Sequence, residues 1–389
     1  MKILIAYLFL IVFFPLVTFA EIDTYYPIHN WRTSSAEKQN MNVAYLNQMH
    51  DKYDQNGQII VIKNGYLIES KKLIDFSKVE HIHSCTKSVI SLLYGMVNQS
   101  DSVDEFIVEY FPSYKRADNI DVNIYHLLSM TSGMDWSDNP NIDSKQLPYE
   151  PDWVKYILSK KIVIKPGTQW SYNSGASQLL SVIMQKQLKY PLKNYVEQKL
   201  FIPLNISEYT WWNSNDGYLT AGWGLHLSVF DITKIGYLML KNGQWNGKKV
   251  ISKHWIKEVS SRKVKINNDF SYGYQWWIYD CLPFEAYKAY GNYGDHSVMI
   301  IIVPELNLEV VLIGNINNDI EILKEYIIPS VNTKNLSIAS TRVSALRSGP
   351  TGAHFFIQAP RKLSEILGRN HRRFMISMRC TSMSDFSFS

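Results

Sequence analysis

The chain has 389 residues, of which 46% are hydrophobic and 19% are charged, so it can bury a large core and is expected to form two lobes. Its formal net charge is +5, but seven of the ten arginines lie beyond residue 340, which leaves no basic face for nucleic acid in the rest of the chain. Three cysteines, Cys85, Cys281 and Cys380, are too few and too scattered for a disulfide framework or a zinc site.

The first 20 residues, "MKILIAYLFLIVFFPLVTFA", place Lys2 before an apolar run and carry small residues at Thr18 and Ala20. This pattern predicts a signal peptide that is cut after Ala20. The alternative is an uncleaved membrane anchor, because the apolar run is nearly long enough to span a bilayer. We therefore expect a periplasmic or secreted protein without stable membrane insertion once the signal peptide is removed.

Residues 57–70, "GQIIVIKNGYLIES", are two β-rich runs around Asn64-Gly65, which predicts a hairpin. The next segment, residues 80–96 ("EHIHSCTKSVISLLYGM"), has apolar residues at three- and four-residue spacing and is predicted to be a helix with one buried stripe. Ser84 lies where a helix cap or first-turn residue belongs.

From about residue 106 to 270 the pattern is mostly helical, as in "PDWVKYILSK", "ASQLLSVIMQKQL" and "FDITKIGYLMLKNG". Strand character returns in "SYGYQWWIY" and in "SVMIIIVPELNLEVVLIGN", where two β-rich runs are joined by a turn. A closing helix is predicted in "NDIEILKEYIIP".

Strands at both ends with helices between them predict an α+β fold, in which an antiparallel sheet from N- and C-terminal segments is flanked by helices beside an inserted helical lobe. We assign residues 21–105 and 270–331 to the sheet domain and residues 106–269 to the lobe. In residues 332–389, Lys gives way to Arg and hydrophobic periodicity fades, so we expect a disordered tail foreign to the fold.

Ser84 and Lys87 stand one helical turn apart, so the amine can reach the hydroxyl. A buried lysine with a pKa lowered by desolvation can accept the hydroxyl proton, and the start of a helix favours a developing oxyanion. The same spacing recurs at Ser35 and Ser260, so it is not diagnostic by itself. Only Ser84 begins an apolar helix directly after a hairpin, where a buried lysine is costly without a role.

From about residue 50 to 331 the chain resembles the serine β-lactamase-like family, which includes class C β-lactamases, penicillin-binding DD-peptidases and related esterases and amide hydrolases. The landmarks, in the family's order, are "HSCTKSVISLL", "IYHLLSMTSGMDW", "KPGTQWSYNSGASQLLSVI", "GWGLHLSVFDITKIGYLMLKNGQWNGKKVIS" and "YGYQWW". The resemblance implies the family fold, a sheet flanked by helices beside a mostly helical lobe, with the site between them.

By this resemblance Ser84 is the acylated serine and Lys87 is the lysine that activates it. Tyr172, in "WSYNSG", matches the tyrosine that helps to move protons to and from the serine and the leaving group. The family often has Asn two residues later, whereas this chain has Ser174. Its hydroxyl can bond a substrate carbonyl but lacks the amide donor.

The family's third motif is usually Lys or His, then Thr, Ser or Gly, then Gly, on a strand that lines the site. Its expected position in this chain is His296, Ser297 and Val298, where the valine adds bulk in place of glycine. The alternative is that His296 is an ordinary loop histidine. The resemblance also implies an oxyanion hole formed by the backbone N–H of Ser84 and one near Met299.

Two aromatic residues, Trp223 and Trp276, are candidates for the wall of the substrate cleft, and the alternative is packing within the core or lobe. His81 and His83 form a His-x-His pair, but no third and fourth ligand follow at metal spacing. We therefore expect two ordinary strand or loop histidines and no metal site.

The sequence thus resembles an exported serine hydrolase that forms an acyl-enzyme with a small ester, amide or β-lactam substrate. An ester or amide is favoured because Ser174 and Val298 alter positions that bind the β-lactam in the family's antibiotic-hydrolysing members. No metal or organic cofactor and no nucleic acid is implied as a partner, and the oligomeric state stays open. The alternative is a catalytically decayed protein that binds or senses penicillin or peptidoglycan fragments.

Overall fold

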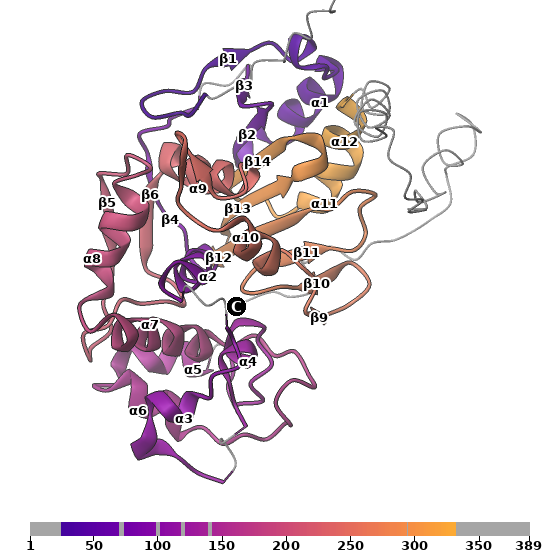
Figure 1. The fold of residues 1–389 in the computed structure, drawn as a ribbon. Coiled ribbons are helices and arrows are strands. Elements are labelled where there is room, and N and C mark those ends of the chain that lie inside the picture. The colour runs from indigo at the N-terminus through magenta and orange to yellow at the C-terminus, as the bar shows by residue number, and fades with distance from the viewer. Residues whose placement is uncertain are drawn as a thin grey trace, which may run out of the picture.

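A computed structural model describes residues 25–69, 74–98, 102–117, 121–138, 142–293 and 295–331 (Figure 1). The strands are β1 (Thr33–Ser34), β2 (Gly57–Lys63), β3 (Tyr66–Ile68), β4 (Val79–His81), β5 (Tyr209–Trp211), β6 (Leu225–Ser228), β7 (Gln244–Trp245), β8 (Lys248–Lys249), β9 (Val264–Lys265), β10 (Phe270–Tyr272), β11 (Trp277–Tyr279), β12 (Tyr287–Tyr293), β13 (His296–Val303) and β14 (Leu308–Gly314). The predicted signal peptide and the predicted tail lie outside the described residues.

The α-helices are α1 (Val43–Tyr53), α2 (Cys85–Val97), α3 (Ile107–Tyr110), α4 (Ile124–Leu128), α5 (Ile142–Gln146), α6 (Trp153–Ser159), α7 (Ser174–Leu188), α8 (Leu192–Val196), α9 (Val229–Leu240), α10 (Lys253–Val259), α11 (Asp319–Glu321) and α12 (Ile328–Ser330). Short 3₁₀ or π segments are η1 (Glu37–Gln39), η2 (Asp54–Asn56), η3 (Pro112–Tyr114), η4 (Leu147–Tyr149), η5 (Glu197–Phe201), η6 (Pro304–Leu306) and η7 (Ile322–Ile327). Among the described residues, no helix combines the length and apolar character needed to cross a membrane.

The main sheet has nine strands in the order β1-β3-β2-β14-β13-β12-β11-β10-β9, so both ends of the chain build it. Strands β1 and β3 pair in parallel, and the other paired strands of this sheet are antiparallel. The predicted α+β architecture is therefore confirmed, with β1 making the sheet mixed. The predicted hairpin is present as β2 and β3, whose turn residues Asn64 and Gly65 both have positive φ, as a tight two-residue turn requires.

The two faces of the sheet enter two different hydrophobic clusters because successive side chains of a strand point in opposite directions. On β13, Val298 and Ile300 join the cluster that contains α2 and α9, whereas Met299 and Ile301 join the cluster that contains α1 and η7. The near-continuous apolar run of this strand is therefore explained by helices on both of its faces. This arrangement fixes α2 against one face of the sheet.

The helical lobe lies beside the sheet and includes α3 to α7, with α7 packed against α2 and α4 (Figure 1). Residues 106–269, which we assigned to the lobe, also contain α9, which instead packs on β13 and β14. The same range contributes β5 and β6 to a three-stranded sheet with β4. The periodicity does not indicate these two short strands, because each is too brief for a clear alternation.

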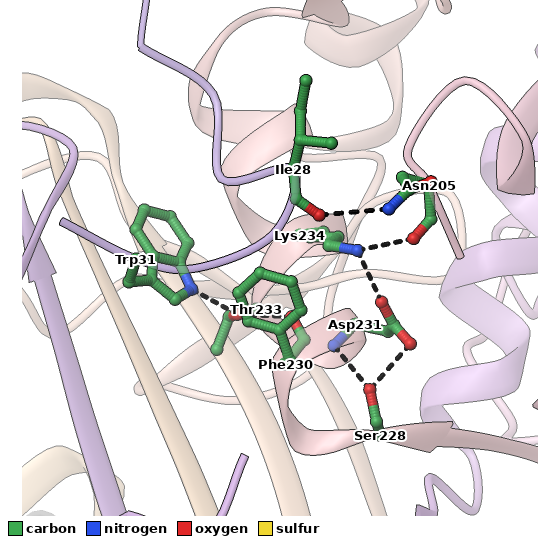
Figure 2. A network of polar contacts seen from close by, with 8 residues as sticks. All are labelled: Ile28, Trp31, Asn205, Ser228, Phe230, Asp231, Thr233 and Lys234. Carbon is green, nitrogen blue, oxygen red and sulfur yellow. Dashed lines mark hydrogen bonds and ion pairs between the residues drawn. The ribbon is translucent and has the colours of Figure 1, made fainter. Parts of the chain in front are cut away.

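A buried ion pair anchors α9 to the segment that precedes β1 (Figure 2). Lys234 Nζ lies 2.8 Å from an oxygen of Asp231 and donates to the backbone oxygen of Asn205 at 2.8 Å. The Asn205 amide in turn donates to the backbone oxygen of Ile28 at 3.2 Å. A buried ammonium is tolerated only when such partners replace water, so this network holds the N-terminal segment in place.

Glu309 on β14 is fully buried, and both of its carboxyl oxygens lack a hydrogen-bond partner among the described residues. Its side chain lies beneath Gly236 of α9, where a Cβ added to that glycine would approach Oε1 to 2.1 Å. Burial raises the pKa of Glu309 well above its ordinary value of 4.5. The carboxyl is therefore held neutral in the folded protein, at a cost to stability.

We expect Glu309→Met to raise the free energy of unfolding by about 1 to 3 kcal/mol at pH 7, because it removes an unsatisfied buried group of similar size. The folded-state pKa is raised, so the unfolded state ionises first and the stability of the parent falls as pH rises above 4.5. The gain in the variant should therefore be larger at pH 8 than at pH 4 in urea unfolding. The exposed Glu305 offers a control, Glu305→Met, and an equal effect there would contradict the assignment.

Candidate active site

A strained turn places Ser84 at the start of α2. After β4 the chain turns at His83, whose φ of 46° is unusual for a residue other than glycine. Cys85 N then donates to Ile82 O at 3.0 Å, which closes the first turn. Ser84 occupies the N-cap position, yet its side chain makes no capping hydrogen bond to the helix. Its hydroxyl is thus directed to groups outside the helix backbone.

Lys87 supplies the first of these groups. Its Nζ lies 2.9 Å from Ser84 Oγ and 2.7 Å from the backbone oxygen of Gly222, and the side chain is only 1% exposed. Burial lowers the pKa of Lys87 from 10.5 to about 8, although the charge of Asp138 acts in the opposite direction. A fraction of the amine is therefore unprotonated near neutral pH and able to accept the serine proton.

Tyr172 supplies the second. It precedes α7 and is hydrogen-bonded to the Ser84 side chain, while Lys87 Nζ lies 4.7 Å from the centroid of its ring. Burial raises the pKa of Tyr172 well above 10, so its phenol keeps its proton at neutral pH. The ring stacks against Trp277 at 6.3 Å. The three residues Ser84, Lys87 and Tyr172, which the sequence assigned to proton transfer, are thus brought together.

Asp138 is a buried residue of the site that sequence reasoning missed. Its Oδ2 accepts a hydrogen bond from the Ser174 backbone N–H at 2.6 Å, and its carboxylate also interacts with the Ser174 hydroxyl. The negative charge raises the pKa of Lys87. Ser174, predicted to contact substrate, is buried against Asp138. A lone acid in "WSDNP" carried no signal, because only the packing of α7 against α2 brings it near Lys87.

Strand β12 approaches the Ser84 turn more closely than a side chain would allow. A Cβ placed on Gly291 would lie 2.5 Å from both Ser84 N and Ile82 O. Glycine is therefore required at this point. Strand β12 pairs with β13 along its length but with β11 only at its start, as far as Lys288. The later part of this strand thus presents an edge without a β11 partner next to Ser84.

The third motif is predicted on β13, and the structure corrects this. Strand β13 is an inner strand, in which Met299 lies opposite Tyr290 of β12 and Leu312 of β14. Its backbone N–H is therefore inside the ladder, not free to form an oxyanion hole. The Ser297 hydroxyl donates to Ile316 O at 2.9 Å, within the fold.

The other two residues of the predicted motif also face away from the serine hydroxyl. Val298 is fully buried in the core, and its carbonyl accepts a hydrogen bond from Cys85 Sγ at 3.2 Å. His296 Nε2 lies 3.0 Å from a carboxyl oxygen of Glu80. The glycine that meets the serine is Gly291, and the missed signal was the glycine in "AYGNY", one strand earlier in the chain.

The two tryptophans proposed for the cleft differ in their surroundings. Trp276 is fully buried with its ring 5.7 Å from that of Tyr287, so it belongs to the core and not to a cleft wall. Trp223 is half-buried beside Gly222 and lies 5.8 Å from Trp153. Within the part of the chain that the structure describes, no group of three or more His, Cys, Asp or Glu side chains could hold a metal ion.

A sheet that joins both chain ends, a helical lobe beside it, and a buried lysine bonded to a serine at a helix start define a serine hydrolase-like fold and site. The chain belongs to the Beta-lactamase family, whose model matches residues 55–326.

Solved structures agree on the fold. A candidate 6-aminohexanoate-dimer hydrolase from Bacillus anthracis is 17% identical with a TM-score of 0.63, covering 83% of this chain and 90% of its own. An octameric penicillin-binding protein homologue from Pyrococcus abyssi is 20% identical with a TM-score of 0.60, covering 79% and 82%. A D-amino acid amidase from Ochrobactrum anthropi SV3, complexed with L-phenylalanine amide, is 14% identical with a TM-score of 0.55, covering 70% and 90%.

The influence of Asp138 on Lys87 can be measured without a substrate. Because the carboxylate charge raises the pKa of Lys87, we expect Asp138→Asn to lower it below about 8. The amide oxygen can still accept the Ser174 N–H, so the helix start is preserved. NMR titration of lysine side chains labelled with ¹³C at Cε would follow the change. The exposed Asp135 offers a control, Asp135→Asn, and a rise or no change in the Asp138 variant would contradict the coupling.

Proposed function

We propose that this protein is an exported serine hydrolase that forms an acyl-enzyme at Ser84. The single observation that carries the proposal is the 2.9 Å contact between Ser84 Oγ and the buried Nζ of Lys87, whose pKa is lowered to about 8. A nucleophile bonded to a desolvated amine has its base already in place. Export rests on the segment before Glu21, outside the described residues, and a mature N-terminus at that residue would support it.

Acylation follows from the two perturbed groups. Unprotonated Lys87 takes the Ser84 hydroxyl proton as the oxygen attacks the substrate carbonyl, forming a tetrahedral intermediate. When this collapses, the bond from the carbonyl carbon to the leaving group breaks. The leaving group needs a proton, and the phenol of Tyr172, which stays protonated, can donate it. The ammonium of Lys87 then returns a proton to Tyr172.

The developing oxyanion needs donors that are already oriented. The N–H of Ser84 at the start of α2 is one, and the open edge of β12 beside Gly291 offers the second. This replaces the donor that we expected near Met299. Hydrolysis of the acyl-enzyme then reverses the sequence, with water losing a proton to the same basic groups and Ser84 regaining its own.

We favour a small ester or amide as the substrate. Two structures with the same fold carry names of amide hydrolases, a 6-aminohexanoate-dimer hydrolase and a D-amino acid amidase. Ser174 also supports this choice, since its hydroxyl is bonded to Asp138 and lacks the amide donor of the family's usual Asn. Val298 no longer supports it, because its side chain is in the core.

We expect Ser84→Ala to abolish hydrolysis with little loss of stability, because the side chain does not cap α2 and its removal leaves the core intact. Mass spectrometry of the parent mixed with an activated ester or a penicillin should show a mass increment on the peptide that carries Ser84. For a hydrolase this adduct decays in seconds to minutes with at least one substrate class.

Ser260, which also precedes a lysine by three residues, provides the control, and Ser260→Ala should retain activity. An adduct that persists for hours with every substrate would favour the alternative of a penicillin- or peptidoglycan-binding sensor. Turnover that survives in Ser84→Ala would sink the acyl-serine mechanism.

The pH dependence of kcat/KM should report the Lys87 amine. Because its pKa is lowered to about 8 and the unprotonated form is the base, activity should rise as pH increases through that value. Lys87→Arg keeps the charge but cannot lose its proton at these pH values, so we expect a loss of about 10²- to 10⁴-fold. A flat profile between pH 6 and 9 for the parent would contradict the role of Lys87.

A further inference from the structure

One histidine of the His-x-His pair is bonded to the loop that holds Lys87. His81 is the last residue of β4 and lies opposite His226 of β6. The backbone N–H of Gly224 donates to His81 Nε2 at 3.0 Å. Nε2 can accept this bond only when it carries no proton, so the contact requires a neutral imidazole with its hydrogen on Nδ1.

Gly224 is two residues from the carbonyl that contacts the catalytic pair. Gly222 O accepts a hydrogen bond from Lys87 Nζ at 2.7 Å and lies 3.4 Å from Ser84 Oγ. Gly224 has a φ of 101°, a conformation in which other residues are strained. A segment of such glycines has little rigidity of its own, so contacts from outside must set the position of the Gly222 carbonyl.

Three further contacts hold this loop in place. Ala221 N donates to the Gln178 side chain at 2.9 Å, and Leu225 N donates to Thr86 Oγ1 at 3.3 Å. Gly224 O accepts a hydrogen bond from the Trp212 backbone at 3.1 Å. The side chain of His81 therefore fills the remaining position, at the N–H of Gly224 itself.

The surroundings of His81 keep its imidazole neutral. Its ring stacks on His226 at 4.4 Å and lies 4.2 Å from the ring of His83, which in turn lies 5.7 Å from His296. Burial and these imidazoles lower the pKa of His81 to about 3. The charged group on the same strand, Glu80, is paired with Lys78 and His296. The acceptor state is thus maintained well below neutral pH.

We propose that His81 is a positioning residue for the hydrolase reaction: by accepting the Gly224 N–H it fixes the loop whose Gly222 carbonyl orients Lys87 toward Ser84. His81 touches neither the substrate nor the reacting atoms. The inference rests on the proposed function for its kinetic consequence, but the loop contact itself can be tested without turnover. The histidine pair in the sequence then has a role other than binding metal.

The test compares His81→Gln, whose amide oxygen can still accept the Gly224 N–H, with His81→Leu, which has no acceptor. We expect the Leu variant to lose about 10- to 100-fold in kcat with KM within about threefold, because misplacing Lys87 affects the chemical step more than binding. The Gln variant should keep kcat within about threefold of the parent. His254 is exposed on α10, and His254→Leu is the control.

Hydrogen exchange of the peptide that contains Gly224, followed by mass spectrometry, reports the same contact in the absence of any substrate. It should be faster in His81→Leu and unchanged in His81→Gln. Equal impairment of both variants in kcat and exchange would overturn the acceptor role and leave only packing. Unchanged kcat and exchange in His81→Leu would overturn the proposal altogether.

If the Leu variant does not fold, ¹⁵N NMR of the parent decides the question, because Nε2 of His81 must titrate as an unprotonated acceptor at pH 7. A protonated Nε2 would overturn the proposal. Failure of the proposed function has a different signature, namely no adduct at Ser84 and no ester hydrolysis by the parent. In that outcome faster exchange in the Leu variant would still establish that His81 fixes the loop.

Discussion

The burial of one amine next to one hydroxyl is the constraint on which the site depends. Lys87 is fully buried in a place where its charged form is penalised, and its partners are the Gly222 carbonyl and the more distant charge of Asp138. These partners come from a loop beside β6 and from the end of the helical lobe. The sheet and the lobe must therefore be packed together before the lysine acquires its lowered pKa.

The close approach of β12 is the second condition on the site. At Gly291 the strand comes so near to the Ser84 turn that a single methyl group would collide with backbone atoms. The same approach leaves a strand edge beside the serine, where an oxyanion can find backbone donors. Because these donors belong to the main chain, they tolerate changes in neighbouring side chains, which explains how this site departs from the family pattern at Ser174 without losing its frame.

Two buried acids illustrate how differently the fold treats charge. Asp138 is bonded to the start of α7 and tunes a neighbouring amine, so its burial is compensated. Glu309 has no such partner among the described residues and is held neutral between β14 and α9. A polar group that contributes only a cost in stability marks a place where the core tolerates imperfection. The polar groups around Lys87, by contrast, are connected to one another.

The sequence by itself determined the features that depend on neighbours along the chain. The Asn64-Gly65 turn, the apolar stripe of α2 and the placement of Ser84 and Lys87 on one helix face all follow from short-range periodicity and turn chemistry. Tertiary structure alone decided which strand meets the serine, Gly291 of β12 and not Val298 of β13. Two adjacent β-rich segments have similar patterns, and only their order in the sheet makes one an edge and the other an inner strand. The contacts of Asp138 and His81 join residues far apart in the chain, so no local pattern could encode them.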